Sequence, residues 1–228
     1  PPEYHRQIDQ DRSYPEAFVD ALTKAGWMAV LIPEEYGGSG LGLTEASVIM
    51  EEINRSGGNS GACHGQLYNM GTLLRHGSNA QKQKYLPRIA SGELRLQSMG
   101  VTEPTTGTDT TKIKTKAEKR GEKYVINGQK VWTSGADIAQ WCGALVRTDP
   151  KVKKRSGISF IMFPVDQPGV RTRPVKLISG DSPFCEMFFD IAVNVCYGLC
   201  VYFCSCCVFC LPWSPCGFCF PNGRLEIT

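Results

Sequence analysis

The stretch Met99-Gly-Val-Thr-Glu-Pro-Thr-Thr-Gly-Thr-Asp109 lies where the sequence changes from helical to strand-like. Residues before it carry the periodicity of amphipathic helices, and residues after it form the short apolar runs and alternations typical of strands. The stretch holds four threonines with Pro104 and Gly107, which predicts a loop rich in hydrogen-bonding groups. We therefore expect an α+β fold, with an N-terminal helical domain at residues 1–94 and a mostly antiparallel β-sheet or small barrel at residues 95–190.

Capping residues and apolar periodicity predict three helices before this stretch. Ser13 with Glu16, and Ser78 with Gln81, can each form a capping box, in which two side chains bond the free N–H groups of a first helical turn. Thr44 can cap the helix between them. The predicted helices lie within residues 13–27, 43–58 and 78–93.

Strand signals follow the stretch. Lysines at 112, 114 and 116 alternate with Ile113, Thr115 and Ala117, the pattern of a half-buried strand with a solvated face, although attraction of phosphate stays open. Asn127-Gly128 separates two apolar runs, which predicts a hairpin turn there. Pro168-Gly169 predicts a turn between two further strands. Those strands cover residues 157–165 and 170–178, and another strand covers residues 184–191.

Composition and motifs exclude several classes of protein. Charged residues make up 21% of the chain and hydrophobic residues 42%, so the chain is globular rather than disordered. The net charge of +3 does not indicate a nucleic-acid-binding protein. The glycines at 37–42 match no dinucleotide-binding fingerprint, and the three histidines lack the spacing of metal ligands. Cys63 next to His64 indicates a buried small cysteine on a helix rather than a nucleophile with its base.

The hydroxyl groups of the opening stretch suit a flavin. Threonine hydroxyls and loop N–H groups can bond the carbonyl and ring-nitrogen edge of an isoalloxazine. Trp132, Thr133 and Ser134 supply an aromatic face and two more hydroxyls at the end of a predicted strand. A threonine-rich turn beside a core tryptophan would give the same sequence, so the chemistry alone leaves both interpretations open.

Five motifs, in this order and at these separations, resemble the acyl-CoA dehydrogenase family. They are PEEYGG, HGSNAQKQKYLPRIASGE, MGVTEPTTGTD, NGQKVWTSG and EMFFD, and together they cover about residues 14–190. The resemblance implies FAD as the cofactor, with Thr102 at the pyrimidine edge, Trp132 near the ring and Ser134 near its N5. Thr108, usually serine in the family, would contact both flavin and acyl-CoA. The full set of implied cofactor-binding residues is Met99, Gly100, Val101, Thr102, Thr108, Trp132, Thr133 and Ser134.

The resemblance also implies a reaction and its partners. In the family a glutamate removes the α-proton of an acyl-CoA thioester, a hydride leaves the β-carbon for the flavin, and an electron-transfer flavoprotein takes the electrons. That glutamate and much of the homo-oligomeric interface belong to a C-terminal helical domain. After Asp190 this sequence offers only one carboxylate, Glu226, so we expect no catalytic residue in this chain and little activity from it alone. The expected location is a mitochondrial matrix or a bacterial cytoplasm.

Residues 191–228 depart from the family and are rich in cysteine. We expect a segment that does not fold as a domain. Alternatives are a membrane anchor from Ile191 to Trp213, a metal site formed by two C-x-x-C pairs, or a disulfide scaffold. Functional alternatives to a dehydrogenase are therefore a non-catalytic flavin- or acyl-CoA-binding module, a subunit-interaction module, and a membrane-anchored interaction protein. The two C-x-x-C pairs are at positions 207, 210, 216 and 219.

Overall fold

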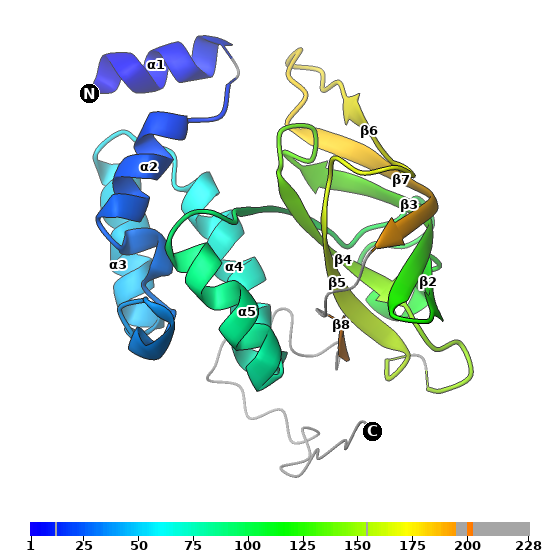
Figure 1. Ribbon diagram of the computed structural model, residues 1–228. Helices are drawn as coiled ribbons and strands as arrows, with labels where there is room; N and C mark the ends of the chain where they lie inside the picture. The colour runs from blue at the N-terminus through cyan, green and yellow to red at the C-terminus, as the bar shows by residue number, and fades with distance from the viewer. Residues whose placement is uncertain (12, 154, 195–199, 203–228) are drawn as a thin grey trace.

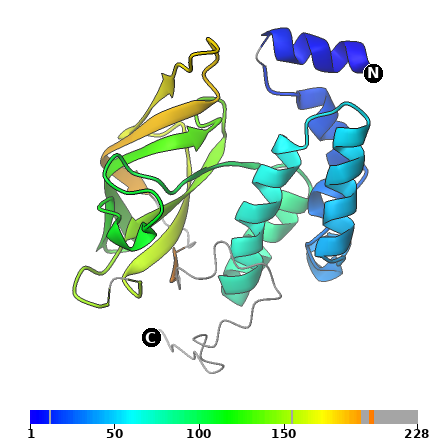
Figure 2. The same cartoon turned by 180° about the vertical axis from the view of Figure 1, so that it is seen from behind.

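The computed structural model describes residues 1–11, 13–153, 155–194 and 200–202. Within them a group of helices lies beside a curled, mixed β-sheet (Figures 1 and 2). The expected α+β fold, helical first and sheet second, is confirmed.

The helical part contains five α-helices and two short 3₁₀ helices among the described residues. Gly26, with φ of 79°, follows α2 and ends it in the left-handed conformation that glycine adopts without strain. The helices are α1 (Pro2–Asp11), α2 (Glu16–Lys24), α3 (Leu43–Arg55), α4 (Gly61–His76) and α5 (Asn79–Ala90), with 3₁₀ helices at Trp27–Ala29 and Glu34–Tyr36.

Only one of the three predicted caps forms. At α5 the Ser78 hydroxyl accepts from Gln81 N and the Gln81 side chain accepts from Ser78 N, so this capping box is confirmed. The Ser13 cap is wrong, because the N-cap of α2 is Pro15, which makes no side-chain cap. The Thr44 cap is also wrong, because α3 begins one residue earlier and the Glu45 carboxylate accepts from Gly42 N at 2.8 Å.

The sheet is mostly antiparallel and its strand order departs from the chain order. The order is β6-β7-β3-β2-β4-β5-β8, with β1 pairing parallel to β4 and β2 meeting β4 in parallel at one residue pair. The strands are β1 (Leu96–Gly100), β2 (Lys116–Arg120), β3 (Lys123–Ser134), β4 (Trp141–Arg147), β5 (Ile158–Pro164), β6 (Val170–Val175), β7 (Phe184–Asn194) and β8 (Cys200–Tyr202).

The hairpin predicted at Asn127-Gly128 is wrong. β3 runs through both residues without turning, and the turn lies instead at Gly121, between β2 and β3. Gly128 marks an irregularity in the pairing of β3 with β7, where its φ is 145°. A Cβ on Gly128 would lie 2.7 Å from the Cα of Thr115, so the glycine permits a close backbone approach and not a turn.

The alternation of lysines with other residues correctly predicts which side chains are buried, but it does not predict where the strand begins. Ile113, Thr115 and Ala117 are buried while the lysines between them are exposed, yet β2 begins only at Lys116. The reason is Arg147, whose side chain donates to the carbonyls of Thr111 at 2.8 Å and Ile113 at 3.2 Å. Those carbonyls bind a side chain and not a neighbouring strand.

The predicted turn at Pro168-Gly169 is confirmed, with φ of 84° at Gly169. The strands that it separates, β5 and β6, do not pair with each other. β5 pairs with β4, and β6 pairs with β7 at the other end of the sheet order. β7, predicted as a strand over residues 184–191, continues to Asn194.

One hydrophobic cluster joins the helices to the sheet. Leu73 and Leu86 from the helical part pack with Leu96, Leu145 and Phe160 from the sheet, all nearly inaccessible to solvent. α4 lies against β1, where the Asn69 amide donates to Ser98 O at 3.3 Å. A second cluster fills the inside of the sheet itself.

Most of the cysteine-rich segment falls outside the described residues. Its first residues complete β7, and residues 200–202 pair antiparallel with β5. The C-x-x-C pairs and most of the span proposed from Ile191 to Trp213 lie beyond the described part. Among the described residues, none of the helices has the length and apolarity needed to cross a bilayer.

Candidate functional site

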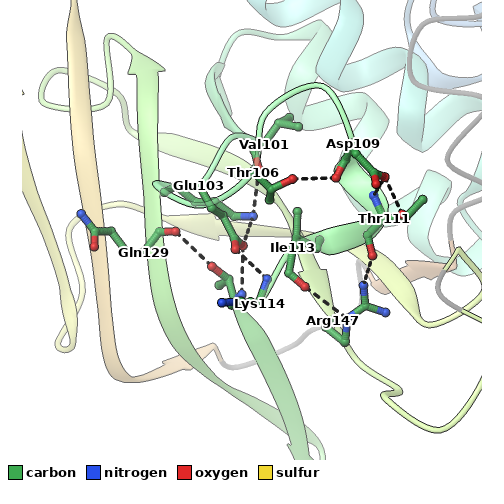
Figure 3. A network of polar contacts seen from close by, with 11 residues as sticks. Val101, Glu103, Thr106, Asp109, Thr111, Ile113, Lys114, Gln129 and Arg147 are labelled. Carbon is green, nitrogen blue, oxygen red and sulfur yellow. Dashed lines mark hydrogen bonds and ion pairs between the residues drawn. The ribbon is translucent and has the colours of Figure 1, made fainter.

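The loop that leaves β1 is closed by its own backbone and side chains. Glu103 N donates to Thr106 O at 2.9 Å and Thr106 N donates back to Glu103 O at 3.1 Å, which makes a tight turn around Pro104. The Thr106 hydroxyl donates to Asp109 O at 2.7 Å (Figure 3). The Asp109 carboxylate accepts from Thr111 N and pairs with Lys112, and the Thr111 hydrogen bonds lower its pKa. The loop is therefore held in a defined conformation by its own hydrogen bonds and ion pair.

This loop lies against the end of β3. Val131 N donates to Thr102 O at 2.9 Å, and the Ser98 hydroxyl donates to Ser134 O at 2.7 Å. These bonds bring the two groups of predicted flavin residues, which lie about thirty positions apart in the sequence, to one place on the molecule.

Trp132 lies at a bulge in β3 and is exposed to solvent. Pairing with β7 shifts between Lys130 and Thr133, and Trp132 between them has φ of 60°, in the left-handed region that large residues rarely adopt. The residue is 52% exposed, and its ring meets that of Phe184 edge-on, with ring centroids 5.9 Å apart. The interpretation of Trp132 as a core tryptophan is wrong. A strained, exposed aromatic residue is typical of a binding site.

The eight predicted flavin-binding residues differ in their exposure to solvent. Thr108 and Ser134 are exposed, and Thr102 is half-buried. Met99 and Val101 direct their side chains onto the core shared with the helices, so they offer a ligand mainly their backbone. Gly100 and Thr133 are also buried, and the Thr133 hydroxyl finds no hydrogen-bond partner among the described residues.

Sequence reasoning missed an ion pair beneath the loop. The Lys130 ammonium, with a side chain 0% exposed, lies 2.9 Å from a Glu103 oxygen, with a side chain 3% exposed. A lysine in a strand otherwise indicates a solvated position. The sequence carries no signal of its burial, because Gly128 and Trp132, two positions either side of it, are exposed.

Burial and pairing act on the pKa values of this ion pair. Burial tends to raise the pKa of Glu103, but the Lys130 ammonium and hydrogen bonds from Lys114 and Thr115 outweigh it and lower that pKa. For Lys130, burial lowers the pKa and the Glu103 carboxylate opposes this effect. Lys130 donates to a carboxylate and a carbonyl, which is the geometry of an ammonium.

The three described cysteines for which side chains are placed are free and buried. Cys63 is buried in α4, so the prediction of a buried small cysteine on a helix is confirmed, and burial raises its pKa to about 11. His64 lies beside Tyr68 instead, with ring centroids 5.0 Å apart. In the described part, no three His, Cys, Asp or Glu residues gather where they could bind a metal ion.

An open hollow lies between the second half of the loop, Arg147 at the end of β4 and the residues that follow it. None of the eight predicted flavin residues lines it, and its charged lining is basic. The residues around it are Thr105, Thr111, Lys112, Ile113, Lys114, Arg147, Pro150 and Val152. The strongest convergence of predicted residues is therefore on the face that carries Thr102, Trp132 and Ser134, and not in this hollow.

Comparison with known protein families gives two matches. Residues 2–93 match the acyl-CoA dehydrogenase N-terminal domain, and residues 98–192 match the acyl-CoA dehydrogenase middle domain.

Individual relatives agree. The chain is 38% identical over 190 residues to acyl-CoA dehydrogenase IpdE1 of Mycobacterium tuberculosis, which covers 82% of this chain and 48% of the relative. It is 40% identical over 162 residues to mitochondrial isovaleryl-CoA dehydrogenase of Oryza sativa subsp. japonica, covering 69% of this chain and 39% of that protein. An acyl-CoA dehydrogenase crystal structure from Geobacillus kaustophilus superposes with a TM-score of 0.76 at 26% identity, over 88% and 53% of the two chains. The chain spans about half the length, or less, of the curated relatives it matches.

Proposed function

This chain belongs to the acyl-CoA dehydrogenase family, and we propose that it forms the FAD-binding and part of the acyl-CoA-binding wall of such an enzyme. The proposed division is an N-terminal helical domain to residue 94, a middle β domain over residues 95–190 and a non-family segment over residues 191–228. The activity in question is α,β-dehydrogenation of acyl-CoA thioesters.

The observation that carries the proposal is the meeting of the loop after β1 with the end of β3. It places the Thr102 hydroxyl, the exposed Trp132 indole and the exposed Ser134 hydroxyl on neighbouring backbone segments. A planar aromatic ligand with acceptors along one edge fits this set of donors and its aromatic face.

Each residue then has a role in binding. Thr102 and Ser134 orient the flavin ring by hydrogen bonds, Trp132 packs near it, and Thr108 contacts the acyl-CoA. Trp132 and the loop also keep water from that side of the ring. Bound FAD supplies the acceptor for the two electrons removed when the double bond forms.

No residue of the proposed site is a base for the α-proton. Two loop carboxylates adjoin it. Glu103 is buried and paired with Lys130, and Asp109 bonds Thr111 and pairs with Lys112. Both are held below their ordinary pKa, so each is a poor proton acceptor. The proposal leaves this role to the family glutamate of a C-terminal helical domain. The chain as given is then expected to have little activity alone.

The partners of the whole protein follow from the family. We propose an electron-transfer flavoprotein as electron acceptor and a homo-oligomer as the assembled form. We propose a bacterial cytoplasm or a mitochondrial matrix as the location, since the relatives include a mycobacterial protein and one named as mitochondrial.

FAD titration tests the binding proposal. The chain should quench flavin fluorescence saturably, and Ser134→Ala should weaken binding about 10-fold, the effect of one lost hydrogen bond. Ser47→Ala is the matched control, because Ser47 is equally exposed but lies on α3. Absence of saturable quenching by the folded wild-type chain would refute the proposal.

A second candidate is a flavin- and acyl-CoA-binding module without catalysis. It is favoured by the state of Glu103, which leaves the site without an available base. Neither candidate predicts bleaching of the flavin by this chain alone. Anaerobic addition of an acyl-CoA separates the two when the family's C-terminal helical domain is supplied: bleaching of the flavin absorbance would then indicate a dehydrogenase, whereas a shifted but unbleached spectrum would indicate the module.

A further inference from the structure

Glu103 and Lys130 each adjoin a segment of the proposed flavin site. Glu103 follows Thr102 in the loop, and Lys130 precedes Trp132 by two positions in β3. Their side chains meet below the loop with a separation of 2.9 Å, and both are almost fully buried. The pair carries no assigned role in binding FAD or acyl-CoA.

The ion pair forms hydrogen bonds with the backbone at both ends of the loop. The Lys130 ammonium also donates to the carbonyl of Val101 at 3.0 Å, where the loop begins. The Glu103 carboxylate accepts from Lys114 N at 2.6 Å and from Thr115 N at 2.9 Å, where the loop ends (Figure 3). One buried ion pair thus binds β3, the entry of the loop and its exit.

The bond from Lys130 to Val101 also fixes the direction of a peptide group. The C=O and N–H of a trans peptide point in opposite directions, and none of the described peptides is cis. With the Val101 carbonyl turned towards the buried ammonium, the Thr102 N–H points away from it. Among the described residues nothing accepts a hydrogen bond from that N–H, while Thr102 O is taken by Val131 N.

We propose that Lys130 and Glu103 are positioning residues, which orient the Thr102 N–H as a donor to the cofactor without touching it. This inference rests on the proposed FAD-binding function. A charged pair suits the task better than apolar residues, because Lys130 bonds one backbone carbonyl and Glu103 bonds two backbone N–H groups. Such bonds fix the direction of the peptide groups, which apolar packing does not.

The test is FAD affinity of the full chain carrying Glu103→Gln and Lys130→Met together. The double variant leaves no uncompensated buried charge, so it is expected to be more stable than either single variant. We expect its far-UV circular dichroism to match wild type and its FAD dissociation constant to rise about 10-fold or more. Lys116→Met, which removes an exposed lysine from β2, should leave the dissociation constant unchanged.

The outcomes separate the two proposals. A folded wild-type chain that binds no FAD would refute the proposed function. A folded double variant that binds FAD as tightly as wild type would overturn only the positioning role.

A measurement on the unaltered chain keeps the inference testable if the variants do not fold. Residue-resolved amide hydrogen exchange should show a fast Thr102 N–H in the FAD-free chain and a slow one once FAD is bound. A Thr102 amide that FAD leaves unchanged, while quenching shows that FAD is bound, would overturn the proposal.

Discussion

Single residues decide what the loop can present to a ligand. Trp132 is exposed because β3 carries an irregularity there, and its positive φ turns the side chain out of the sheet. Lys130, two positions earlier, turns inward and meets Glu103. The sequence does not show which of the two side chains points out of the sheet and which points inward. That depends on the shift in the pairing of β3 with β7, a strand about fifty positions away in the sequence.

The buried thiols give a prediction at this scale. Burial raises the pKa of Cys63 and Cys185 to about 11 and that of Cys142 to about 12, so thiolate is scarce at neutral pH. We expect all three to resist iodoacetamide in the folded chain and to react once the chain is unfolded in urea. Peptide mass spectrometry reads each site separately. Labelling of Cys142 in the folded chain would contradict this packing.

The Glu103 carboxyl predicts a pH dependence of stability. Its pKa in the folded chain lies below the ordinary 4.5, so its charged form stabilises the fold above pH 4.5. At neutral pH Glu103→Gln should lower the free energy of unfolding by about 3–5 kcal/mol, since Lys130 would remain charged and buried.

This difference from wild type should shrink as the pH falls below 4.5 through the folded pKa, where the wild-type carboxyl also loses its charge. Urea unfolding at a series of pH values measures it. Glu118→Gln, which alters an exposed pair, is the control and should cost much less. A difference independent of pH would show that the charge of Glu103 does not matter.

At the scale of elements, helix caps and turns predicted from local sequence formed only where no other residue or strand took over the same backbone hydrogen bonds. Ser78 caps α5 as expected, but at α3 the Glu45 carboxylate bonds Gly42 N and the helix begins before Thr44. In β3 the Asn127-Gly128 pair has the composition of a turn, yet the strand continues, because β2 and β7 pair with β3 on either side.

Two alanine substitutions test the caps. Ser78→Ala should lower the free energy of unfolding by about 1 kcal/mol, because Gln81 N loses its acceptor. Thr44→Ala is the matched control, a surface residue in a first helical turn that caps nothing, and should change stability by less than about 0.5 kcal/mol. Thermal unfolding followed by circular dichroism compares them. Equal losses would mean that the Ser78 hydroxyl does not cap α5.

At the scale of the whole molecule, the helices and the sheet share one core. Leu73 on α4 and Phe160 on β5 belong to the same buried cluster, and Asn69 bonds β1 directly. The helices are therefore held in place by the same packing that holds the sheet.

This shared core predicts cooperative unfolding. Leu73→Ala should lower the free energy of unfolding by about 2–5 kcal/mol, the cost of a cavity at a fully buried leucine. Far-UV circular dichroism, which follows the helices, and tryptophan fluorescence should report the same shifted midpoint. Leu41→Ala, at an exposed leucine, is the control. Separate midpoints for the two signals would show that the parts fold independently.

The sequence by itself determined the order of helices and sheet, the α5 cap, the turn at Pro168-Gly169 and the family resemblance that the comparisons confirmed. These features depend on periodicity, on single capping residues and on motifs, which are all local. The family also supplied the candidate flavin residues, although it said nothing of how they are held.

Only the tertiary structure decided that the loop after β1 meets the end of β3, that Trp132 is exposed and that Lys130 is buried. The physical reason is that strand pairing and burial depend on partners distant in the chain. The sequence alone does not show whether a threonine or lysine side chain contacts water or a buried carboxylate.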